Sequence, residues 1–341
     1  MVPTFTADDD VIDAWMEYMG VTRGRSARTV EAYRSVLGKL REFLEGKPLM
    51  DADEVDLETF CGLWLHKRGV IAQSRKPYIS AVRGFYAWLK ASGAVASNAS
   101  SHLVHPMTGR PLPRVMTLAN AERLMWAPDM GTFIGLRDAA ILSLLIGCGL
   151  RISGLVGLNE GDLQTVPLEK EMRLVVRVTE KGNRDRLMPV PREAEMVLRV
   201  YMGHEELAVV DRTTRRRDGR DDKVLFVSVR STLLGPHEHV GEKRRLTRKG
   251  VQDLILRYGT RLEIPRAELH PHAMRHLFGT ELLEGDTSML SIQELMGHVD
   301  PKSTSVYMHL AMGKKIQAMD RAAPLGKMRT PVSELLRRLP K

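Results

Sequence analysis

The chain has 341 residues, 43% of them hydrophobic, and its 51 lysines and arginines against 42 acidic residues give a net charge of +9. This length exceeds one typical core and predicts two domains. The excess of positive charge favours a polyanionic partner such as nucleic acid. The two cysteines, Cys61 and Cys148, lie far apart without a Cys-x-x-Cys pair, which argues against a disulfide framework or a zinc ribbon.

No segment has the features of a secretion signal or a membrane span. The N-terminus, MVPTFTADDDVIDAW, lacks a basic stretch followed by an apolar one, and the longest apolar run, 139–150, is too short to cross a bilayer. We therefore expect a cytoplasmic protein without a membrane partner.

Two apolar stripes with steps of three and four predict helices between residues 10 and 91. They are Val30, Tyr33, Leu37, Leu40 and Leu44, and then Tyr78, Val82, Phe85 and Leu89. Ser26 and Thr29 are candidate caps for the first helix. Basic residues lie beside the stripes, where they either form a solvated face or contact DNA. The candidates for DNA contact are Arg25, Arg28, Arg34, Arg75, Lys76 and Arg83.

Residues 91–115 are rich in Ser, Gly, Ala and Pro and have no sustained period, which predicts a linker between domains. We expect a helical domain at 1–92, the linker at 93–113, a second domain at 114–312 and a C-terminal tail at 313–341.

The second domain is predicted to be mixed α/β. Helical patterns cover 117–125 and 135–158, and they resume from about 247. Between them, the branched runs of MRLVVRVTEKGNRDRLMPV (172–190) flank a Lys-Gly-Asn turn and predict a β-hairpin. The polar segment 206–223 predicts a loop. The expected fold class is therefore mainly α with a small β-sheet.

The segment ELHPHAMRHLFGTELL (268–283) contains three histidines and an arginine within nine positions: His270, His272, Arg275 and His276. His272 and His276 have the spacing of a zinc helix, but the glutamate that this motif needs after its first histidine is replaced by Ala273. The alternative is an anion pocket. A helix beginning near Pro271 places His272 and Arg275 on one face, where they can bind phosphate oxygens and transfer a proton. A core histidine and a surface arginine are the third interpretation.

Four residues elsewhere favour the anion pocket. Arg151 ends an apolar run, and Lys181 lies in the predicted hairpin turn. His298 follows Gly297 at a predicted helix end, and Tyr307 comes nine residues later. Together with His272 and Arg275 they offer five basic groups and a phenol.

In order and spacing, four segments resemble blocks of the tyrosine recombinase (phage integrase) family: GLRISGLVGL, TEKGNRDRLMPV, HPHAMRHLFGTELL and ELMGHVDPKSTSVYMHL. The resemblance covers residues 117 to about 312. It extends more loosely to SARTVEAYRSVLGKLREFLE, which resembles the family's helical, SAM-like core-binding domain.

The resemblance implies a site-specific DNA recombinase or integrase with a catalytic domain of this type. Tyr307 would attack a DNA phosphodiester and form a 3′-phosphotyrosyl intermediate. Lys181 would protonate the departing 5′ oxygen, and His272 would assist proton transfer at the tyrosine. The groups that would bind the phosphate oxygens are Arg151, Arg275 and His298.

The resemblance also implies how the protein works with others. No metal, ATP or other cofactor would be needed. The partners would be a recombination site in double-stranded DNA, three further copies in a homotetramer on that DNA, and in some systems accessory DNA-bending or directionality proteins. The origin would be a bacterium, a phage or another mobile element, and the enzyme would be associated with the nucleoid. The tail would dock on a neighbouring subunit through Val332, Leu335, Leu336 and Leu339.

One position departs from the family pattern. Gly154 stands where members usually carry Glu or Asp, and Glu160 or Asp162 is a hypothetical substitute. The same residue set also suits a type IB topoisomerase or a hairpin-forming DNA strand transferase. A DNA-binding regulator that has lost the reaction is a further alternative.

Overall fold

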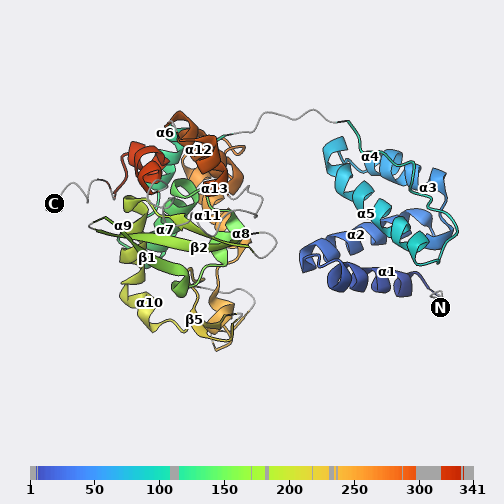
Figure 1. Cartoon of the computed structure of the whole chain (residues 1–341), viewed down its shortest axis with the longest axis horizontal. Coiled ribbons are helices and arrows are strands. Elements are labelled where there is room, and N and C mark those ends of the chain that lie inside the picture. The colour runs from blue at the N-terminus through green and yellow to red at the C-terminus, as the bar shows by residue number, and fades with distance from the viewer. Residues whose placement is uncertain are drawn as a thin grey trace. The chain divides into compact units, whose positions relative to one another are not determined.

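The computed structural model describes residues 5, 7–107, 115–169, 171–180, 184–216, 218–229, 234–235, 237–285, 287–296, 316–331 and 333. The chain divides into two compact units, Met1–Pro111 and Leu112–Lys341 (Figure 1). Within these residues, none of the helices combines the length and the apolar character needed to cross a membrane.

Unit 1 is helical. Its elements are α1 (Asp8–Glu17), the π-helical turn η1 (Tyr18–Thr22), α2 (Ala27–Leu44), the 3₁₀ turn η2 (Leu49–Asp51), α3 (Glu54–Thr59), the π-helical turn η3 (Phe60–Trp64), α4 (Leu65–Lys67) and α5 (Ala72–Ala91). The helices predicted from the two apolar stripes are confirmed as α2 and α5.

The core of unit 1 is formed by the faces that the stripes predicted. Leu37, Leu40 and Phe85 are fully buried and pack with Trp15 of α1. The hydroxyl of Ser26 accepts the Thr29 N–H at 3.3 Å and caps α2, as predicted. Residues 93–103 of the expected linker continue this unit, since Leu103 is buried in the same core.

Unit 2 is built around α7 (Phe133–Gly147), a helix buried on nearly every side. The elements before the sheet are α6 (Leu118–Met125), α8 (Ile152–Val156) and the 3₁₀ turn η4 (Glu160–Asp162). After the sheet come α9 (Arg192–Met202), α10 (Glu205–Val209), β4 (Thr213–Arg215), β5 (Asp221–Lys223), the 3₁₀ turn η5 (Gly241–Arg244), α11 (Arg248–Arg261), α12 (Pro271–Glu284), α13 (Met289–Met296) and α15 (Pro324–Lys327). Figure 1 shows the helices grouped about α7 and the sheet.

The main sheet of unit 2 has three antiparallel strands in the order β1 (Leu163–Leu168), β2 (Glu171–Glu180) and β3 (Arg184–Pro189). The predicted hairpin is confirmed as β2 and β3, with Val178 opposite Arg186. Sequence patterns did not predict β1, a strand of six residues that contains Pro167 and is only partly buried.

The prediction of a loop at 206–223 is wrong. This segment forms α10 and the β4–β5 hairpin, because two of its arginines pair with acidic residues of the turn η4. Arg212 is buried, donates to the Val224 carbonyl at 3.0 Å, and pairs with Glu160 at 3.0 Å. Arg216 pairs with Asp162 at 2.5 Å.

The described part of the tail packs into unit 2. Residues 316–322 are helical, Ile316 packs on Val175 of β2, and Asp320 pairs with the buried Arg173. Leu325 of α15 is buried against the core around α7. The residues that we expect to dock on a neighbouring subunit, Val332, Leu335, Leu336 and Leu339, lie outside the described residues.

Candidate active site

The loop that follows α7 brings Arg151 close to α12. Gly149 has φ +57, and a Cβ there would lie 2.3 Å from Cδ1 of Phe278 on α12, so both the backbone conformation and the space require glycine. Arg151 then takes an extended conformation as the residue before α8, and it is half-buried.

α12 begins where the sequence predicted, with Pro271 in its first turn. His270 is the N-cap residue, and its Nδ1 accepts the Ala273 N–H at 3.0 Å. His272, which directly follows Pro271, is exposed, and so is His276, one helical turn later. Among the described residues, no three histidine, cysteine or carboxylate side chains lie together as a metal site.

Arg275 lies on the His272 face of α12 but is buried, with 5% of its surface exposed. Its guanidinium donates to the Gly149 carbonyl at 2.5 Å and also to the carbonyl of Met296, the last residue of α13. Arg275 therefore joins the Arg151 loop, α12 and the end of α13. The structure brings Arg151, His272 and Arg275 together.

A third arginine, which the sequence interpretation missed, lies at the same place. Arg186 of β3 is half-buried and donates from Nη1 to the Leu295 carbonyl at 2.5 Å. The alternation of side chains along a strand could have revealed it. Arg186 lies two residues before the buried Met188 and therefore on the same, inward face of β3.

The three guanidinium groups repel one another. Burial, and after it the charges of Arg151 and Arg186, lower the pKa of Arg275 to about 9, so Arg275 still carries its proton at neutral pH. Burial and the charge of Arg186 also lower the pKa of Arg151. Positive charges this close raise one another's energy, and a bound anion would relieve that repulsion. The cluster is therefore suited to phosphate.

His272 is neutral under the same conditions. Partial burial lowers its pKa below the ordinary value of 6.5, and the positive charges of His270, His276, Arg275 and Arg151 lower it further. A neutral imidazole beside a bound phosphate can accept a proton.

Gly154 has no space for a side chain. A Cβ at this position would lie 2.7 Å from Cγ1 of Val178 on β2, so an apolar strand residue occupies the space that a side chain at 154 would need. The hypothesis that Glu160 or Asp162 substitutes is not supported. Glu160 pairs with Arg212 at 3.0 Å, and Asp162 pairs with Arg177 and Arg216 at 2.8 and 2.5 Å.

Lys181, His298 and Tyr307 lie outside the described residues. The structure does describe their neighbours: β2 ends at Glu180, and α13 ends at Met296, directly before Gly297 and His298. The backbone that precedes His298 is thus held by Arg186 and Arg275.

The six candidates for DNA contact lie on unit 1. Arg25, Arg28 and Arg83 are exposed, and Lys76 is half-buried. Arg34 pairs with Asp13 at 2.6 Å. Arg75 donates to the Gly62 carbonyl at 3.1 Å, which gives it a part in holding η3.

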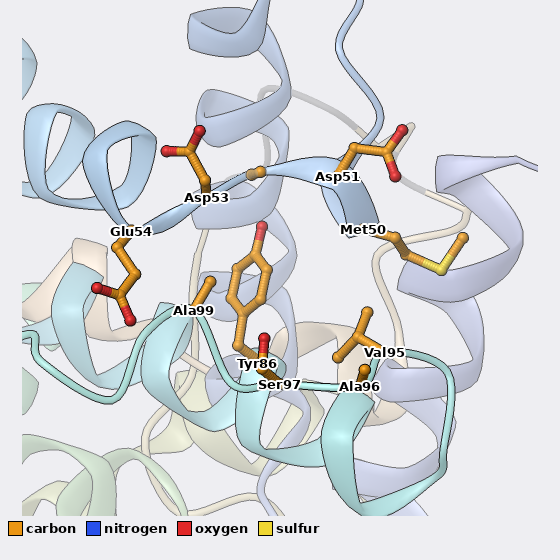
Figure 2. A pocket seen from close by; sticks show the side chains of 10 residues that line it. Met50, Asp51, Asp53, Glu54, Tyr86, Val95, Ala96, Ser97 and Ala99 are labelled. Carbon is orange, nitrogen blue, oxygen red and sulfur yellow. The ribbon is translucent and has the colours of Figure 1, made fainter.

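Unit 1 also contains a hollow of about 370 Å³, shown in Figure 2. Acidic side chains from η2 and the start of α3, namely Asp51, Asp53 and Glu54, lie on one side, and the segment 95–99 forms the other. Tyr86 lies at its base and donates its hydroxyl to the Leu49 carbonyl at 2.6 Å. Carboxylates repel phosphate, so this hollow does not compete with the arginine cluster as a phosphate site.

Two family models match the chain: the phage integrase family over residues 114–314, and the phage integrase N-terminal SAM-like domain over residues 12–93. The chain therefore belongs to the phage integrase family of tyrosine recombinases. It is a tyrosine-type recombinase, an enzyme that breaks and rejoins DNA strands.

Its relatives match nearly the whole chain. Tyrosine recombinase XerD of Pseudomonas aeruginosa is 30% identical over 322 residues, which cover 94% of this chain and 99% of that protein. Tyrosine recombinase XerC of the same organism is 32% identical over 319 residues, covering 93% and 95%. The resemblance inferred from the four sequence segments is confirmed.

Solved structures confirm the predicted fold class. XerH recombinase bound to a palindromic difH substrate is 16% identical, with a TM-score of 0.61, over 92% of this chain and 84% of that chain. A lambda integrase dimer bound to a COC′ core site is 15% identical, with a TM-score of 0.61, over 87% and 97%. The fold is mainly helical with small sheets, and it combines a SAM-like domain with a catalytic domain.

Proposed function

We propose that this protein cleaves and rejoins a specific DNA site through a 3′-phosphotyrosyl intermediate on Tyr307. The observation that supports the proposal most is the cluster of Arg151, Arg186 and Arg275, whose mutual repulsion a DNA phosphate would relieve. Membership of the tyrosine recombinase family gives the class of reaction.

In the cleavage step, a bond forms between the Tyr307 oxygen and phosphorus while the bond from phosphorus to the 5′ oxygen breaks. The phenol is a weak nucleophile, with an ordinary pKa of about 10, so its proton must leave as it attacks. His272 accepts that proton, and Lys181 gives a proton to the departing 5′ oxygen.

Arg151, Arg275 and His298 bind the non-bridging oxygens and stabilise the charge of the transition state. The phosphotyrosyl bond keeps the energy of the broken phosphodiester, so rejoining needs no nucleotide. The arginines supply the electrostatic stabilisation that a metal ion gives in other phosphoryl transfers.

We further propose that the enzyme acts as a homotetramer that exchanges strands between two duplexes. A solved structure of similar fold, with a TM-score of 0.60 and 14% identity, is a lambda integrase tetramer bound to a Holliday junction. Unit 1 would contact DNA through its exposed arginines, mostly at phosphates. We place the enzyme at the nucleoid of a bacterium, in a chromosomal, phage or mobile-element system, with accessory DNA-bending or directionality proteins where directionality requires them.

The test begins with covalent capture. The full chain is incubated with fragmented DNA from its host, SDS-resistant adducts are isolated, and the attached DNA is sequenced to define the captured site. We expect adducts with the wild type and none with Tyr307→Phe. Adducts that persist in this variant would show that another residue is the nucleophile, and no adduct with the wild type would support a DNA-binding regulator.

A second assay separates recombination from topoisomerase activity. Two labelled duplexes that carry the captured site should exchange strands. Relaxation of a supercoiled plasmid without any exchange between duplexes would favour the type IB topoisomerase alternative.

A further inference from the structure

The geometry points to Arg186 as a positioning residue of the cleavage site, which together with Arg275 fixes the end of α13 that leads into His298. This inference rests on the proposed function, since it assigns a role within the same reaction.

The contacts are specific to the end of the helix. Arg186 donates to the Leu295 carbonyl at 2.5 Å, and Arg275 donates to the carbonyl of Met296, so two guanidinium groups bind the last two carbonyls of α13. A hydrogen bond from a charged guanidinium to a backbone carbonyl is stronger than a neutral one. The Leu295 side chain is buried as well, so this end of α13 is held by both its backbone and its side chain.

The two arginines come from separate elements. Arg275 is on α12, whereas Arg186 is on β3, where its register opposite Val178 of β2 and the buried Met188 two residues later fix the strand. A helix end that is fixed from a helix and from a sheet has little freedom to rotate. We expect this restriction to limit where the chain can carry the next residues, Gly297 and His298.

Arg186 also adds charge to the phosphate site. Its positive charge acts on Arg151 and on Arg275, the two residues that would clamp the phosphate. Removing the guanidinium therefore removes both a donor to the Leu295 carbonyl and one of three positive charges. We expect Arg186→Met to slow covalent adduct formation at saturating DNA by about 10- to 100-fold, the range for one charged hydrogen bond.

Another explanation for such a defect has to be separated from this one. Arg186 lies on β3, five residues after Lys181, so its loss could instead displace the general acid. A substrate in which sulfur replaces the bridging 5′ oxygen distinguishes the two, because a thiolate departs without a proton. In that reaction the Tyr307 oxygen bonds to phosphorus, the phosphorus–sulfur bond breaks, and the phenol proton still goes to His272.

The experiment uses the full chain and a nicked duplex of the captured site, in oxygen and sulfur versions, at a temperature where circular dichroism shows every variant folded. Lys181→Ala should be slow on the oxygen substrate and recover on sulfur. Arg186→Met should stay slow on both, and Arg186→Lys should recover part of the rate because it keeps the charge and one donor. The matched control is Arg177→Met, on β2 of the same sheet, which pairs with Asp162 and should cleave at the wild-type rate.

Full recovery of Arg186→Met on the sulfur substrate would overturn the inference, and so would wild-type rates for both Arg186 variants on oxygen. These results differ from a failure of the proposed function, in which the wild type itself forms no adduct.

Discussion

Arg41 of unit 1 and Arg275 of unit 2 are held in different ways. In unit 1, Arg41 pairs with Asp9 at 2.5 Å, and the two side chains are 47% and 79% exposed, so solvent screens the pair. In unit 2, Arg275 is buried and its donors point at backbone carbonyls. A carboxylate partner cancels the charge of an arginine, whereas a carbonyl orients the guanidinium and leaves its charge for a ligand. Arg41 is therefore a neutralised surface arginine, whereas the charge of Arg275 remains available to an anion.

The strongest test of this comparison is Arg275→Lys. Lysine keeps the charge but cannot donate in a planar fork to Gly149, Met296 and a phosphate together. We expect single-turnover cleavage of the captured site to fall by about 100- to 1000-fold, with DNA affinity changed only a few-fold.

Arg41→Lys is the matched control for that experiment, since its exposed partner accepts an ammonium equally well. It should cleave at the wild-type rate and change the free energy of unfolding by less than about 0.5 kcal/mol. Equal defects in the two variants would remove the distinction between the two kinds of arginine.

A second test concerns the close contact between Gly154 of α8 and Val178 of β2. Gly154→Ala places a Cβ within 2.7 Å of Val178 Cγ1, so we expect a loss of about 1–3 kcal/mol in the free energy of unfolding. Val178→Ala removes that methyl group and leaves a cavity of its own. In the double variant the alanine at 154 fills part of that cavity, so denaturant titrations should show losses well below the sum of the single changes. Additive losses would show that the two positions do not touch.

Sequence patterns predicted much of this site, because helical spacing and motif order are local properties. The stripe from Val30 to Leu44 was sufficient for α2, and Pro271 predicted the start of α12 and the shared face of His272 and Arg275. Family resemblance then supplied the roles.

What the sequence did not predict depends on pairing between distant segments. Arg216, which follows β4, pairs with Asp162, 54 residues away in the sequence. The strand β1 forms by pairing with β2. The contact of Arg186 with Leu295 joins residues 109 apart, and the contact of Gly154 with Val178 joins a helix to a strand. The periodic pattern of one segment does not show which distant residues that segment will contact.

The surface arginines of unit 1 should show a smaller and more uniform effect. Replacing Arg25, Arg28 or Arg83 with Gln should weaken DNA binding modestly for all sequences and reduce the slope of log affinity against log salt by about 1 each, if each contacts one phosphate. Filter binding at several salt concentrations measures both quantities. Arg41→Gln is the control, since Arg41 already has Asp9 as its partner. An unchanged slope for any of the three would remove that residue from the DNA-contact set.

The smallest expected effect is a pH dependence of stability caused by His272. Its pKa in the folded protein lies below the ordinary value of 6.5, first because of burial and then because of the surrounding positive charges. As pH falls through 6.5, the unfolded chain binds a proton before the folded chain does, so the folded state loses stability. Between pH 7.5 and 5, the free energy of unfolding should therefore fall more steeply for the wild type than for His272→Gln.

His239 has a pKa shifted in the same direction by burial and Arg244, so His239→Gln serves as the reference for a histidine outside the arginine cluster. Inorganic phosphate distinguishes the two. An anion bound between Arg151 and Arg275 favours protonated His272 and raises its pKa, so phosphate should flatten the part of the pH profile that His272→Gln removes. The part that His239→Gln removes should stay as it is. Parallel profiles for the wild type and His272→Gln, with and without phosphate, would mean that His272 does not sense the charges of the cluster.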